Sequence, residues 1–105
     1  MIHVYSYTPS EGEQNVPITA YMNFFIKSTD PTYVRLVVGR KAVATQVQPL
    51  EHCWQLDAVA PPFDRERAGS AKVALTVQLM DGRNTVLESF TFGEFTYWES
   101  SETVL

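Results

Sequence analysis

Residues 72–79 read KVALTVQL, and this stretch decides the fold class of the chain. Its apolar members recur at every second position and share one face: Val73, Leu75, Val77 and Leu79. A period of two is typical of a strand with one buried face. The stretch ends at Asp81-Gly82, a dipeptide that favours hairpins, and residues 85–87 return from it. An antiparallel β-hairpin is therefore expected here.

Elsewhere the chain shows the same short alternating segments and no helical periodicity, and its recurring prolines would interrupt a long helix. Strands are expected at 2–7, 16–25, 33–38, 42–47, 53–60, 71–80 and 85–98. Turns or polar loops are expected at 10–13, 27–31 and 64–67. Gly39-Arg40 would join two of these strands in a hairpin, and Gly93 would form a bulge in the last one. About seven strands without a helix predict an all-β fold, an immunoglobulin-like (E-set) antiparallel β-sandwich.

The alternation within each strand also predicts the core. The expected core residues are Ile18, Leu36, Val38, Leu56, Val73, Leu75, Val77 and Phe95. Trp54 has the parity of Leu56, so we expect it to pack among them, although a lone Trp54 or Trp98 could instead stack on a sugar. The domain would span residues 1–98, and the polar segment 99–105 is expected to be a flexible tail.

Composition limits the possible functions. The chain has 105 residues, 45% of them hydrophobic, which suffices for one domain with a core. Twelve acids against eight bases give a net charge of −4, which argues against a nucleic-acid surface over the whole domain. A single cysteine excludes an internal disulfide, and no apolar run approaches the roughly 20 residues of a membrane span. We expect no membrane association.

The residues that could carry chemistry do not form a recognisable site. His52-Cys53 are neighbours on an expected strand, so their side chains would point to opposite faces, and His3 gives no third ligand at usable spacing. The charges of residues 64–67 alternate in sign, as in a solvated loop. No phosphate-binding loop or hydrolase motif occurs. The sequence predicts no enzyme activity, no cofactor and no metal.

Two exposed segments leave minor alternatives open. Arg40-Lys41 at a hairpin tip could touch a phosphate, so DNA contact by this domain is expected to be at most minor. Residues 102–105 (ETVL) fit the C-terminal peptides that PDZ domains capture by β-augmentation.

Several segments together resemble the IPT/TIG family of immunoglobulin-like domains. Residues 4–12 resemble the opening I-x-x-I-x-P-x-x-G of that family. Residues 34–39 are similar to its V-x-V-x-F-G hairpin, and residues 56–62 to its I-x-C-x-T-P-P segment. Gly69 with the strand 73–77 resembles G-x-x-x-V-x-V, and Phe95-x-Tyr97 resembles the closing F-x-Y. The resemblance covers about residues 4 to 97.

The chain departs from the family pattern around its second strand. Gln14-Asn15 stand where the family usually has glycines. In the family, the second strand ends in the motif G-x-N-F. When this motif is matched to the chain by the side-chain period, its core phenylalanine corresponds to Phe25. Met22 and Phe24 then replace the motif's glycine and asparagine.

Three roles are open, two of them implied by the resemblance. In transcription factors of the Rel, early B-cell factor and calmodulin-binding activator types, such a domain mediates dimerisation or interaction beside a DNA-binding domain. In plexin-like receptors it is an extracellular spacer, and an accessory domain of a carbohydrate-active enzyme is a third alternative. One cysteine and no glycosylation sequon favour a reducing compartment. We therefore expect an intracellular, nuclear protein whose partner is a second copy or another regulator.

The resemblance also implies where a partner would bind. Rel-type domains dimerise through the sheet made by their first, second and fifth strands. By the alternation within these strands, the side chains on the outer face of that sheet would be those of Tyr5, Thr19, Tyr21, Gln55 and Asp57. Tyrosines suit an interface because they bury much area and keep a polar end. An ordinary solvated sheet face is the alternative.

Overall fold

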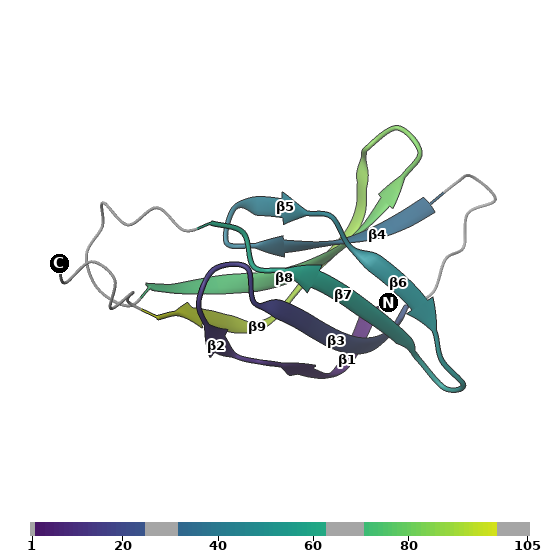
Figure 1. The fold of residues 1–105 in the computed structure, drawn as a ribbon. Helices are drawn as coiled ribbons and strands as arrows, with labels where there is room; N and C mark the ends of the chain where they lie inside the picture. The colour runs from purple at the N-terminus through teal and green to yellow at the C-terminus, as the bar shows by residue number, and fades with distance from the viewer. Residues whose placement is uncertain (1, 25–31, 63–70, 99–105) are drawn as a thin grey trace, which may run out of the picture.

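The structure is a computed structural model that describes residues 2–24, 32–62 and 71–98, and these residues form nine strands in two sheets (Figure 1). The four-stranded sheet has the order β1 (Ile2–Thr8), β3 (Pro17–Phe24), β7 (Trp54–Val59), β6 (Gln46–Pro49). The five-stranded sheet has the order β2 (Glu11–Gly12), β9 (Val86–Tyr97), β8 (Ala71–Asp81), β4 (Thr32–Val38), β5 (Lys41–Val43). Every pairing is antiparallel except that of β2 with β9. The predicted all-β class is confirmed, in a sandwich-like form.

The expectation of a single strand at 42–47 is wrong. Residues 41–43 pair with β4, and residues 46–49 pair with β7 in the other sheet. The hydroxyl of Thr45 accepts a hydrogen bond from the Leu36 amide at 2.9 Å and donates one to the Val43 carbonyl at 2.9 Å. Because this side chain takes a bond that a strand backbone would otherwise make, the chain leaves one sheet and enters the other here.

The turn expected at 10–13 contains a further short strand. Glu11 and Gly12 pair in parallel with Thr96 and Tyr97 at the end of β9. With this strand and the division of 42–47, the described residues contain nine strands instead of about seven.

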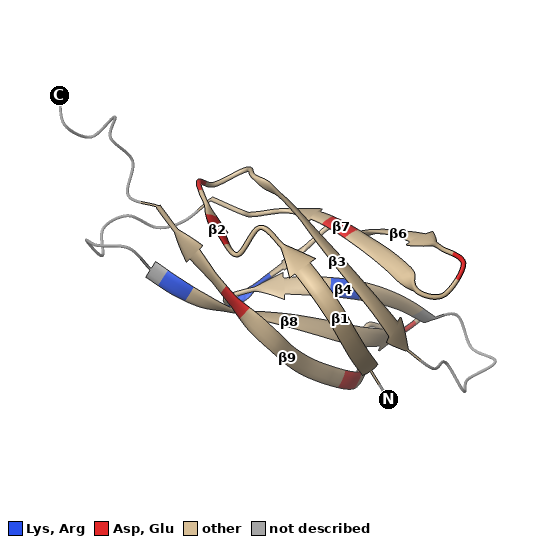
Figure 2. Ribbon diagram, turned by 90° about the horizontal axis from the view of Figure 1, so that it is seen from below, with Lys and Arg blue, Asp and Glu red and all other residues tan. Residues whose placement is uncertain are grey.

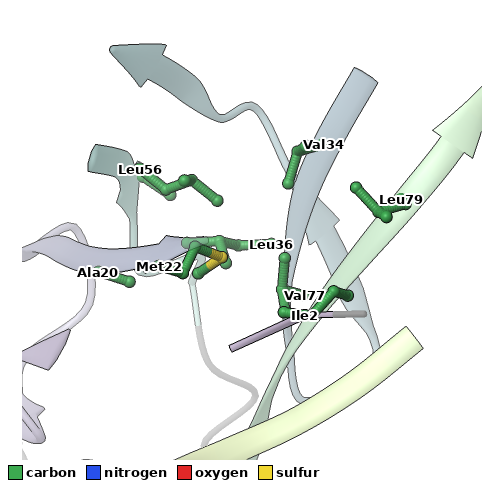
Figure 3. Packing of buried hydrophobic residues seen from close by; sticks show 9 residues of the cluster. Ile2, Ala20, Met22, Val34, Leu36, Leu56, Val77 and Leu79 are labelled. Carbon is green, nitrogen blue, oxygen red and sulfur yellow. The ribbon is translucent and has the colours of Figure 1, made fainter. Parts of the chain in front are cut away.

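The core lies between the sheets as two adjoining clusters. The first contains Ile2, Ala20, Met22, Val34, Leu36, Leu56, Ala58, Val77 and Leu79 (Figure 3). The second contains Ile18, Val38, Ala60, Leu75, Phe95 and Tyr97. All the expected core residues are buried except Val73, which is half-buried. The pairing of β4 with β8 stops at Val38 and Leu75, so no β4 residue flanks Val73.

The aromatic residues near the end of β3 pack inward. Phe24 stacks on Trp54, with ring centroids 5.3 Å apart and an interplanar angle of 24°. Both rings pack against the first cluster, so the expected core position of Trp54 is confirmed. Phe25, the residue assigned as the core aromatic of this strand, lies outside the described residues, as do the segments 27–31, 64–67 and 99–105.

The bulge expected at Gly93 is confirmed. Leu75 pairs with Gly93, but Thr76 pairs with Thr91, so Phe92 is the extra residue on β9. After this shift Phe95 faces the core, whereas Phe90 before it is 43% exposed. In the part of the chain that the structure describes, no helix is long and apolar enough to span a membrane.

Candidate partner face

The outer surface of the four-stranded sheet brings four of the five expected partner residues into two adjacent rows. Ile18, Ala20 and Met22 of β3 point into the core, so Thr19 and Tyr21 between them point outward. Thr19 lies opposite Asp57 and Tyr21 lies opposite Gln55 on β7. All four outward residues are half-buried.

Tyr5 reaches the same surface through a bulge in β1. Val4 pairs with Met22 and Ser6 pairs with Tyr21, which leaves Tyr5 as the extra residue. Its hydroxyl accepts a hydrogen bond of 2.6 Å from Nδ2 of Asn23, and its side chain is 54% exposed. We call the outer surface formed by Tyr5, Thr19, Tyr21, Gln55 and Asp57 the candidate partner face.

The Asp57 carboxylate is held by two neutral donors. Oδ1 accepts a hydrogen bond from the Thr19 hydroxyl at 2.7 Å, and Oδ2 accepts one from Nε2 of Gln55 at 2.9 Å. No basic side chain of the described residues forms an ion pair with it. A carboxylate offers about four acceptor sites, so both oxygens can accept further donors. The two bonds fix the carboxylate in place, and neither donor carries a positive charge.

The sheet that carries this face is almost free of charge. Strands β1, β3 and β6 contain no Asp, Glu, Lys or Arg, and Asp57 is the one such residue on β7 (Figure 2). The acids and bases of the other described strands lie on the second sheet, on β2, β4, β5, β8 and β9. The composition showed an acidic chain, but only the strand order shows that one sheet carries nearly none of the charge.

Sequence reasoning missed three polar members of this surface. Gln46 and Gln48 of β6 pair with Asp57 and Gln55, so they extend both rows. Asn23 links Tyr5 to the carbonyl of His52, at 3.2 Å from its Nδ2. The alternation on β3 could have found Asn23, which shares the parity of Tyr21. The two glutamines could not be found, because Gln46 was expected in a hairpin with residues 33–38 and Gln48 lay outside the expected strands.

Three residues were considered for metal or nucleophilic chemistry: His3, His52 and Cys53. They lie near Asn23, at the Tyr5 end of the candidate partner face. The His3 ring packs edge-on against Tyr5 at 4.7 Å, and His52 lies 3.8 Å from Glu51 with both side chains 88% exposed. Cys53 is a half-buried free thiol. Among the described residues, no three His, Cys, Asp or Glu side chains are grouped so as to hold a metal ion.

No protein-family model matches the sequence, and no curated protein matches it.

Proposed function

We propose that this domain is a non-enzymatic protein-interaction module that self-associates through the candidate partner face. The observation that supports this most directly is the scarcity of charged residues on the four-stranded sheet, whose strands contain Asp57 and no other Asp, Glu, Lys or Arg. The centres of protein interfaces are depleted in charged residues and enriched in tyrosine. Tyr5 and Tyr21 supply the aromatic area, and half-buried amides and hydroxyls supply hydrogen bonds.

The resemblance to IPT/TIG domains of the transcription-factor type supports the same face. In that family the dimer forms through the first, second and fifth strands. Here the strands expected at these places are β1, β3 and β7, which are neighbours in one sheet. On this proposal the chain is part of an intracellular, nuclear regulator whose partner is a second copy or another regulator. DNA contact by the domain is then at most minor.

Sedimentation equilibrium tests the proposal. The wild type should dimerise at micromolar concentrations, and Tyr5→Ala combined with Tyr21→Ala should weaken the dimer at least about tenfold, since tyrosines often dominate interfaces. Tyr33→Ala is the matched control, because Tyr33 is 41% exposed on the other sheet. A wild type that stays monomeric at high micromolar concentration contradicts the proposal. If the double substitution leaves the strength of the dimer unchanged, the interface lies on another surface.

A further inference from the structure

An open groove of about 430 Å³ lies at one end of the candidate partner face. Its walls come from three segments: Pro17 at the start of β3, residues 43–46 at the crossing from β5 to β6, and residues 57–59 at the end of β7 (Figure 1). Pro17 pairs with Val59 two positions along the strands from the Thr19–Asp57 pair. Because alternate residues share a face, the groove is continuous with the candidate partner face.

The walls of the groove are largely apolar. Pro17, Val43, Ala44, Ala58 and Val59 line it, and Val59 is 49% exposed. The Thr45 hydroxyl, which also belongs to the lining, already bonds the Leu36 amide and the Val43 carbonyl. A ligand would therefore find hydrocarbon on most sides.

Asp57 is the one ionisable residue among the described residues that line the groove. Its carboxylate is half-buried and held by Thr19 and Gln55, which contribute no positive charge. Gln46 lies opposite Asp57 on β6 and lines the groove beside it. A partly desolvated anion is stabilised most by a cation that can also form hydrogen bonds. The groove thus combines apolar walls with one fixed negative charge.

We propose that this groove binds an arginine side chain presented by a protein partner. The aliphatic stem would pack against Pro17 and Val59, and the guanidinium would bond the free acceptor sites of Asp57. Arginine suits such a site because its long stem buries readily and its planar group donates hydrogen bonds in a fixed geometry. The net charge of −4 also favours a cationic ligand. This inference rests on the proposed function, because it takes the ligand to be part of a protein partner. It adds that this partner presents an arginine.

The test is an NMR titration of the ¹⁵N-labelled domain with N-acetyl-arginine amide. Saturable shifts are expected at groove amides such as Thr45, Gln46 and Val59, with a millimolar dissociation constant. The neutral isostere N-acetyl-citrulline amide should produce no saturable shift. Asp57→Asn should weaken binding at least about tenfold, as loss of a charge-assisted hydrogen bond predicts. Glu51→Gln is the matched control, since it removes the same charge from a side chain that is 88% exposed in a turn, and it should change nothing.

A second variant keeps the test independent of how well Asp57→Asn folds. Val59→Lys changes an exposed wall residue and places a tethered cation beside Asp57, so it should abolish binding. Absence of saturable shifts in the wild type, or equal shifts from the citrulline compound, overturns the inference. Equal binding of N-acetyl-lysine amide overturns the assignment to arginine. If the protein binds arginine but is monomeric in sedimentation, the groove proposal is supported and self-association is contradicted. If the protein dimerises but does not bind arginine, self-association is supported and the groove proposal is contradicted.

Discussion

The ring of Tyr7 lies against the backbone of Gly93, where β1 of one sheet meets β9 of the other. A Cβ atom at Gly93 would lie 2.6 Å from both Cε1 and Cζ of Tyr7. The Tyr7 hydroxyl donates a hydrogen bond of 3.0 Å to the Glu94 carbonyl and accepts one of 3.2 Å from the Glu94 amide. Its ring also packs edge-on against Phe92 at 5.3 Å. One tyrosine therefore links two strands that belong to different sheets, at the bulge in β9.

Replacing Gly93 with alanine should destabilise the domain, because the added methyl group has no room beside the Tyr7 ring. Overpacking of this kind costs about 1–3 kcal/mol, and a lowered urea midpoint would measure it. In a Tyr7→Ala background the same substitution should cost much less, because the ring is gone. Equal costs in the two backgrounds would contradict the contact.

Replacing Thr45 with valine should destabilise the crossing between the sheets. Valine keeps the shape of the side chain but removes the hydroxyl that bonds the Leu36 amide and the Val43 carbonyl. Leaving such groups unpaired costs about 1–3 kcal/mol. Hydrogen exchange should show faster exchange of the Leu36 amide in Thr45→Val. Thr45→Ser retains the hydroxyl, and protection of Leu36 should persist in it; the same loss in both variants would disprove this role.

The two substitutions also show where sequence reasoning succeeds and where it stops. The alternation of residues 72–79 and the bulge at Gly93 could be predicted, because both depend on local backbone geometry. The crossing at Thr45 could not, since an alternating segment does not reveal which sheet each half joins. The family resemblance placed the strands of Thr19 and Asp57 in one sheet, and the alternation within each strand then put both side chains on its outer face. Alternation could not predict that the strands on either side of Asp57 carry no charged residue, or that a groove forms beside it. Both depend on which strands become neighbours.

Truncating Leu75 should cost far more than truncating Val73, although both belong to one alternating face of β8. Leu75 is 1% exposed, so Leu75→Ala leaves a cavity and should cost about 2–5 kcal/mol. Val73 is half-buried beyond the end of the β4 pairing, so Val73→Ala should cost about 1 kcal/mol. Chemical denaturation of the two variants compares these values. Equal losses would show that Val73 contributes to the core as the sequence alone predicted.

The domain should lose stability in alkaline solution through Tyr97. Burial raises the pKa of the Tyr97 hydroxyl above its usual value of 10.0. The side chain is 4% exposed, and its hydroxyl donates a hydrogen bond of 2.7 Å to the Pro61 carbonyl. In the unfolded chain the phenol ionises near pH 10, whereas in the folded domain it keeps its proton to higher pH. The unfolded state therefore binds fewer protons above about pH 10, so the free energy of unfolding falls as the pH rises from there through the folded pKa.

Urea titrations of the wild type and of Tyr97→Phe at pH values from about 8 to 11 test this coupling. Tyr97→Phe removes both the ionisable group and the bond to Pro61, so it should be about 1 kcal/mol less stable than the wild type near pH 8. Above pH 10 the wild type should lose stability faster than the variant, because only the wild type must keep a buried phenol protonated at this position. The difference between the two proteins should therefore shrink as the pH rises. A constant difference across this range would show that ionisation of Tyr97 is not coupled to folding.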